Sequence, residues 1–405
     1  MIKKDSFSAC VVRLAFSFYL FASVLIKTFI PYDEIRYGIV AVLLIALFSI
    51  FYINNVNLKK CLFFKETVAF MACIVFLLLL TAAKQIISHD FNLSFVKDTV
   101  FMLFPILICF FLVNAEGEGS FDFYAGAYLA SGIFDFFIRF WRIFTPGNIL
   151  AVSFLDSYSA FESELVNIFL PLAFYYLFVK VNIPLAFLSS FLCHLSMKRL
   201  HELFLFLFIF LFFFKIWRKI KIPARLLVVI TVALCLFPIT LDKLVLSPSF
   251  SSWFVERFGV SLNAFTLGRE NIYMSMRENL SMINGLGDSR PVTFAMFGGD
   301  DMHNDILRLY YECTLLGSCS FIAMYMYISK GSNYSLLYML YPMTVMMMSP
   351  MLSSIEGMTC VYIILVAIKA KYNYRRENKN VLLDGIFGGT KKEAREGTGP
   401  DTTQA

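Results

Sequence analysis

Three polar residues whose side chains could take part in a reaction lie together at the start of an apolar segment: His303, Asn304 and Asp305. This group ends the one long polar stretch in a sequence that otherwise reads as nearly continuous apolar helix. Histidine can accept a proton near neutral pH, and polar groups at the mouth of an apolar segment are costly to keep. We therefore expect this segment to do chemistry.

Basic residues lie in and beside the same polar stretch. Arg269 and Arg290 are within it, and Arg308 is just inside the apolar segment that follows. Guanidinium groups are always charged and make paired hydrogen bonds with phosphate oxygens, so these arginines are candidates for binding an anion.

A second basic group occupies a short turn earlier in the chain, where Lys198, Arg199, His201 and Glu202 separate two Phe- and Leu-rich segments. Ionisable groups held between two apolar helices cannot all reach water easily. We interpret the turn as an anion-binding site that faces the long polar stretch. The alternative is that Lys198 and Arg199 pair with Glu202 and with lipid phosphates.

The composition indicates what must position these groups. Of the 405 residues, 59% are hydrophobic, 16% are charged and 47 are Phe. Soluble domains carry about 25% charged residues, so a lipid environment is indicated. The nine cysteines are scattered without a metal-ligand spacing and are expected to pack as small apolar residues. The predicted fold is therefore an all-α polytopic membrane protein.

Apolar segments long enough to cross a bilayer recur along the chain. Twelve spans are predicted, at residues 10–30, 37–53, 66–83, 99–113, 121–138, 163–179, 183–197, 202–217, 222–241, 304–328, 333–349 and 355–369. With twelve spans most Lys- and Arg-rich connections fall on one side, which the positive-inside rule makes cytoplasmic. Both termini are then cytoplasmic in a multi-pass protein of the bacterial inner membrane.

This topology divides the chain into four parts. Residues 1–241 hold spans one to nine, 242–303 form a large periplasmic loop, and 304–379 hold spans ten to twelve. The Gly-rich end, 380–405, is expected to be a disordered cytoplasmic tail, and its composition fits an appended vector-derived sequence. The chemistry-bearing residues belong to the loop and its borders.

The loop itself predicts short amphipathic helices at 251–262 and 268–284. The glycines at 285 and 287, together with Pro291, are expected to end the second helix. Asp300 or Asp301 is expected to cap the next helix, which would place His303 and Asn304 in its first turn.

These residues resemble a known family. Gly268-Arg269, Gly285-Leu286-Gly287, residues 303–307 beginning His-Asn, and residues 312–317 running from Glu to Gly are similar to the loop of the Wzy-type O-antigen polymerase and O-antigen ligase superfamily. The many spans, the single late loop and Arg199 at a helix mouth resemble that family too. The chain departs from it at Ile283-Asn284, where the family often has a proline, and at Cys313-Thr314.

The resemblance implies transfer of a growing glycan from undecaprenyl diphosphate to the non-reducing-end hydroxyl of a new lipid-linked repeat unit. Arg199 and Arg269 would stabilise the leaving diphosphate, with Arg290, Arg308 and Lys198 as further substrate-binding groups. His303 would be the general base.

Asn304 or Asp305 would orient His303 or the acceptor, and His201 could share or replace the role of His303. No metal or other cofactor is expected. The expected partners are the lipid-linked donor and acceptor, membrane lipid and a chain-length regulator protein, with no nucleic acid.

Three alternatives remain from the sequence. An O-antigen ligase would share the motif but transfer the glycan to lipid A-core. A flippase or transporter would need broken helices and ionisable residues near several span centres, where only Arg13 and Asp135 stand. The acidic residues Asp288, Asp300 and Asp301 could instead bind Mg²⁺ or Mn²⁺, although they lack a diagnostic ligand spacing.

Overall fold

The structure is a computed structural model, and it describes residues 6–30, 33–53, 57–58, 61–154, 159–196, 198–215, 224–266, 268–298 and 302–387. These residues form helices and turns and no strand, which confirms the all-helical prediction. The helices of the first half are α1 (Ser6–Phe29), α2 (Asp33–Ile53), α3 (Phe64–Ser88), α4 (Phe95–Glu116), η2 (Glu118–Ser120), α5 (Phe121–Phe140), α6 (Pro146–Leu150), α7 (Val166–Phe174), η3 (Tyr175–Val179), α8 (Ile183–Leu195) and α9 (Arg199–Phe214).

The second half begins with α10 (Ala224–Thr240), which continues into the π-helix η5 (Leu241–Val245). The loop region holds α11 (Pro248–Phe258), α12 (Leu262–Phe265), α13 (Arg269–Glu278), η6 (Leu280–Met282) and α14 (Ser289–Phe297). Three helices follow: α15 (Asp305–Ile328), α16 (Asn333–Met346) and α17 (Ile355–Phe387).

Every predicted span overlaps one helix or a helix with its π-helical extension. By length and composition, four segments among the described residues could cross a membrane: Phe7–Phe29, Phe64–Ser88, Phe95–Glu116 and Arg225–Val245. Shorter apolar helices lie at Tyr37–Ile53, Val166–Val179 and Ile183–Leu195. The chain therefore has the character of a membrane protein.

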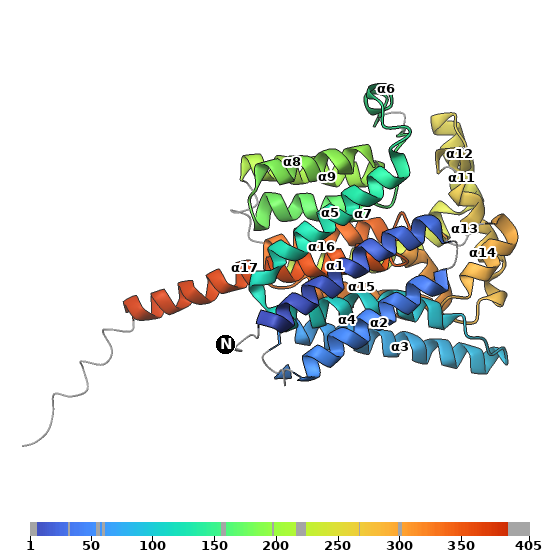
Figure 1. The fold of residues 1–405 in the computed structure, drawn as a ribbon. Helices are drawn as coiled ribbons and strands as arrows, with labels where there is room; N and C mark the ends of the chain where they lie inside the picture. The colour runs from blue at the N-terminus through green and yellow to red at the C-terminus, as the bar shows by residue number, and fades with distance from the viewer. Residues whose placement is uncertain are drawn as a thin grey trace, which may run out of the picture.

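The helices form one bundle with a loop region at one end. Figure 1 shows the start of α1 and the C-terminal part of α17 at the left of the bundle, while α11 to α14 lie at the right. The two ends of the described chain thus lie on the same side, opposite the loop helices. This is the arrangement that an even number of crossings produces.

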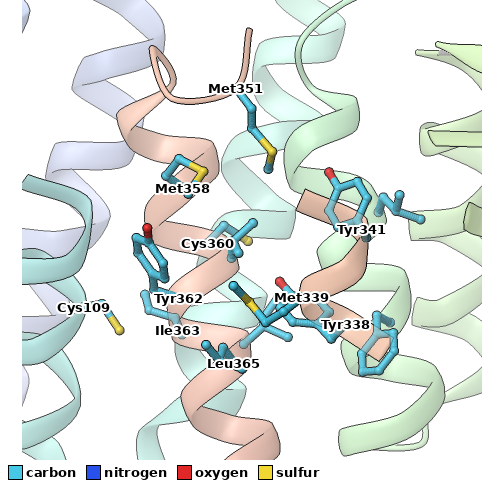
Figure 2. Packing of buried hydrophobic residues seen from close by; sticks show 14 of the residues in the cluster. Cys109, Tyr338, Met339, Tyr341, Met351, Met358, Cys360, Tyr362, Ile363 and Leu365 are labelled. Atoms are coloured by element: carbon cyan, nitrogen blue, oxygen red, sulfur yellow. The ribbon is translucent and has the colours of Figure 1, made fainter. Parts of the chain in front are cut away.

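The centre of the bundle is filled by α17 and its neighbours α4, α7 and α16. Figure 2 shows Met339 of α16 and Cys360 of α17 between these two helices, while Tyr362 lies on the other side of α17, toward Cys109 of α4. Residues along α17 from 358 to 368 are buried on every side of the helix. A helix that is apolar all round belongs in a protein interior, and this one provides the core against which the others are placed.

Three details differ from the sequence predictions. The helix expected to run to residue 284 ends at Glu278, and Pro291 stands in the first turn of α14 instead of stopping a helix. Proline is favoured in a first turn because its missing N–H is not needed there. The last helix continues to Phe387, past residue 380 where the tail was predicted to begin, and residues 388–405 lie outside the described chain.

Candidate functional site

Arg269 is placed by the first turn of α13. Gly268 precedes the helix with φ of 87°, a left-handed conformation that glycine adopts without strain. The guanidinium Nη1 of Arg269 donates to the carbonyl oxygen of Met348, beyond the end of α16, at 2.8 Å. Arg269 is partly exposed, so its guanidinium lies at the surface between the loop region and the end of α16.

Tyr273 links this arginine to the start of α15. It lies one turn after Arg269 on the same side of α13, and its hydroxyl donates to the carbonyl oxygen of His303 at 3.3 Å. Burial raises the pKa of Tyr273 to about 12, although the charge of Arg269 and a hydrogen bond with Asn304 act in the opposite direction. The phenol therefore keeps its proton at neutral pH and remains a donor.

His303 lies just outside α15, and its backbone has φ of 52° in the left-handed region. The residue is exposed. Asn304 is the N-cap of α15, because its side-chain oxygen accepts the Leu307 N–H at 2.8 Å. The prediction that His303 and Asn304 lie in the first turn is therefore wrong. Asp300 and Asp301, the predicted caps, lie outside the described residues.

Asp305 has a contact that the sequence did not indicate. It is buried, and its Oδ2 accepts the backbone N–H groups of Met351 at 2.7 Å and Leu352 at 2.9 Å. Its carboxylate therefore holds the segment between α16 and α17 against the start of α15. This contact gives Asp305 a positioning role at the start of α15.

The two remaining loop-side arginines share one acid. Asp98, in the first turn of α4, accepts Arg290 Nε at 2.8 Å and Arg308 Nη1 at 2.7 Å. The side chains of Arg308 and Asp98 are 2% and 1% exposed. Arg290 and Arg308 were predicted to bind substrate, but these contacts fix α14 and α15 to α4.

A buried acid and a helix break lie next to this ion pair. Glu312 is fully buried, and its Oε1 accepts the backbone N–H and the hydroxyl of Ser289, the latter at 2.5 Å. The helix is broken directly after it, at Cys313 and Thr314. Lys84 of α3 donates to the carbonyl oxygens of Tyr311 and Glu312, which stabilises carbonyls beside the break.

The glycines of the loop allow it to enter the bundle. A Cβ on Gly285 would lie 2.3 Å from Thr81 Cγ2, and one on Gly287 would lie 2.4 Å from the carbonyl oxygen of Ser94. Between them Leu286 is fully buried in the main core. These glycines therefore serve close approach to α3 and α4, and they position Ser289 beside Glu312.

The basic turn at the start of α9 is partly buried. His201 is buried, and its Nε2 lies 2.8 Å from Asn167 Oδ1. Glu202 pairs with His194, whose Nδ1 lies 2.9 Å from its Oε1. Arg199 is exposed and Lys198 partly exposed. His201 is therefore poorly placed to replace His303 as a base.

The end of α16 lies between the two basic groups. The ring of His201 in α9 packs on Tyr341 of α16 with centroids 5.5 Å apart, and Arg269 binds Met348 just beyond that helix. Arg199 begins α9 two residues before His201, so it lies toward the end of α16 beyond which Arg269 contacts Met348. His303 joins them through Tyr273.

Asp98, Lys84 and Glu312 carry much of the local structure, yet Asp98 and Lys84 were not among the predicted residues. Their signal in the sequence is a charged residue within or beside a predicted span. Within the described ranges, no three His, Cys, Asp or Glu side chains are grouped so that they could hold a metal ion.

Comparison with known proteins found no family model that matches the sequence and no similar curated protein.

Proposed function

We propose that this chain is an O-antigen polymerase of the bacterial inner membrane, with twelve spans, both termini in the cytoplasm and the loop of residues 242–303 in the periplasm. The overlap of the predicted spans with helices supports this topology, as does the position of the loop helices opposite both ends of the bundle (Figure 1). The resemblance of the loop motif to the polymerase and ligase superfamily supports the activity.

The observation that carries the proposal is the link between Arg269 and His303. Tyr273 stands one turn from Arg269 and donates to the backbone of His303, so a guanidinium and an exposed imidazole lie at one surface. Glycosyl transfer from a diphosphate needs both groups: a cation where negative charge develops and a base for the attacking hydroxyl. Arg199, at the same end of α16, supplies a second cation.

The step follows from these groups. The acceptor hydroxyl oxygen attacks the anomeric carbon of the donor, and its proton passes to His303. The bond between that carbon and the diphosphate oxygen breaks with both electrons going to the diphosphate. Arg269 and Arg199 stabilise the departing undecaprenyl diphosphate through charge-assisted hydrogen bonds. Arg290, Arg308 and Asp305 hold the helices that present these residues.

One feature favours a second candidate. The break in α15 at Cys313 and Thr314 lies beside the buried carboxyl group of Glu312 and the partly buried ammonium group of Lys84. Discontinuous helices with nearby charged groups are typical of transporters, so a flippase for the lipid-linked unit is the second candidate. Arg13 and Asp135, the two other charges considered for it, are paired with Glu116 and Arg139.

The lipopolysaccharide of a deletion strain separates the candidates. Loss of a polymerase leaves lipid A-core capped by one repeat unit, whereas loss of a ligase leaves bare core with lipid-linked polymer. Loss of a flippase leaves bare core without periplasmic polymer. We expect the single-repeat pattern, restored to a full ladder by the wild-type gene and not by the Arg269→Ala variant. Bare core would contradict the proposal.

A further inference from the structure

A cavity with charged side chains in its lining lies in the bundle, away from Arg269, Arg199 and His303. It is lined by Ser23 and Lys27 of α1, Asp135 and Arg139 of α5, Glu164 before α7, and Glu356 at the start of α17. These positions belong to the last part of α1, the second half of α5 and the first turn of α17. The cavity is therefore at the end of the bundle where the loop helices lie.

The charges in this cavity are arranged in pairs. Lys27 Nζ lies 3.4 Å from Glu164 Oε2, and Arg139 Nη2 lies 2.8 Å from Asp135 Oδ2. The hydroxyl of Ser23 donates to Glu356. The side chains of Lys27 and Glu164 are 34% and 47% exposed, so this side of the cavity is open to solvent.

This pairing selects against a phosphate ligand. Each of the two cations already faces a carboxylate, and Glu356 adds a third carboxylate to the lining. The cations of the lining are therefore already neutralised, in contrast to the surface around Arg269. A neutral ligand with many hydroxyl groups suits the cavity, because carboxylates accept hydrogen bonds from hydroxyls and Lys and Arg donate to their oxygens. Val24, Leu165 and Ile168 add apolar surface for C–H faces.

We propose that this cavity binds the sugar part of the acceptor, an uncharged stretch of the lipid-linked repeat unit. This inference rests on the proposed polymerase function, since it divides the two substrates between two places. The diphosphate of the donor would lie at Arg269 and Arg199, and the acceptor glycan would reach from the cavity toward His303.

One short segment joins the two places. Between α16 and α17, Met348 accepts the hydrogen bond of Arg269, Met351 and Leu352 donate to Asp305, and Ser354 lines the cavity with Glu356. The chain from Met348 to Glu356 spans at most about 28 Å when fully extended. The cavity and the basic surface are therefore close enough for one oligosaccharide to contact both.

Binding of a free glycan tests the inference directly. The probe is the oligosaccharide released by mild acid from the lipid-linked repeat units of the source strain, which carries neither lipid nor diphosphate. Saturation-transfer NMR on the purified full-length protein should show binding. Glu356→Gln should weaken that binding about tenfold, because hydrogen bonds to a charged acceptor are lost. The matched control, Glu162→Gln, changes an exposed carboxylate near Glu164 and should bind as the wild type does.

A second variant tests whether a loss of binding in Glu356→Gln results from misfolding. Asp135→Asn with Arg139→Gln removes both charges of one pair, so no unpaired charge is left in the bundle. It should also weaken glycan binding about tenfold, with the melting temperature of each variant measured alongside. Unchanged glycan binding in both this variant and Glu356→Gln would overturn the inference.

Activity separates this inference from the proposed function. In a polymerase assay, Glu356→Gln should raise the KM for the acceptor about tenfold and leave the KM for the donor unchanged. A protein that binds the glycan through Glu356 but lacks polymerase activity would refute the proposed function and retain the carbohydrate site. If the enzyme is an active polymerase and Glu356→Gln changes neither glycan binding nor the KM for the acceptor, the carbohydrate site is refuted and the proposed function stands.

Discussion

Asp98 and Arg308 are 210 residues apart in the chain and form an ion pair at 2.7 Å, with side chains 1% and 2% exposed. The pair joins the first turn of α4 to the first turn of α15, the helix that begins directly after His303 and Asn304. A buried pair of this kind fixes one arrangement of two helices, because separating its charges in an apolar interior is costly.

Removing the charge of Arg308 should therefore lower the stability of the folded protein. We expect Arg308→Met to lower the free energy of unfolding by about 3–5 kcal/mol, since Asp98 would be left as a buried charge with less compensation. Arg308→Lys keeps the charge and should lose less. Thermal unfolding in detergent measures this, with Arg257→Met on the exposed face of α11 as control. Wild-type stability of Arg308→Met would instead favour the earlier prediction that Arg308 binds substrate.

Gly287 should tolerate no side chain. A Cβ there would lie 2.4 Å from the carbonyl oxygen of Ser94, and the residue has φ of 87°. Gly287→Ala must push the loop away from α4, so we expect loss of folded protein in size-exclusion chromatography. Gly298→Ala is the matched control: its φ is 64°, but no atom lies within 4 Å, so only the backbone term of roughly 1–2 kcal/mol applies. Equal behaviour of the two variants would count against the close contact.

The proposed topology predicts which surface positions react with a membrane-impermeant maleimide in intact cells. With the nine native cysteines replaced, a cysteine at the exposed position Glu256 of α11 should be labelled from the periplasm. A cysteine at the exposed Lys330, between α15 and α16, should react only after the cells are opened. Ser289 is unsuitable because it is 1% exposed and would be protected on either side. Labelling of both positions in intact cells would refute the topology.

The sequence predicted the helices well and their contacts poorly. Each apolar segment overlaps a helix because in a lipid environment the backbone must satisfy its own hydrogen bonds, so length and composition decide. The role of Asp98 could not be predicted in this way. It depends on α4 meeting both α14 and α15, and such long-range pairings leave no periodic signal in the chain.

The start of α15 shows the same limit at one residue. Asp300, Asp301 and Asn304 are all side chains that can cap a helix, so local preference did not select among them. Asn304 is the cap in the structure, and the next residue, Asp305, is held by the backbone of Met351 and Leu352. A contact with a distant segment thus fixes the register, and it moves His303 out of the helix.

Arg269→Ala should remove polymer formation while the protein still folds. The guanidinium is partly exposed and its contact with Met348 is a single hydrogen bond, so the fold should survive its loss. Loss of one donor to a developing oxyanion lowers the rate by about 10²–10³-fold. Arg269→Lys should recover part of the rate, because it keeps the charge without the paired donors. Purified enzyme and lipid-linked repeat unit provide the assay, with Arg257→Ala as control; a fully active Arg269→Ala enzyme would exclude this residue from the site.

Replacing His303 should leave the fold intact but abolish polymer formation. Its φ of 52° is unfavourable for alanine, so His303→Ala would mix backbone strain with loss of the imidazole. Asparagine and glycine adopt this conformation readily, so His303→Asn and His303→Gly should fold normally and form no long polymer. The wild-type transfer rate should rise with pH as imidazole loses its proton, since only the neutral ring accepts one. Chelator should leave that rate unchanged, because the arginines balance the diphosphate charge. An active His303→Asn enzyme, or a rate lost in chelator and restored by Mg²⁺ or Mn²⁺, would refute this mechanism, and the second result would point to Asp288 and its acidic neighbours instead.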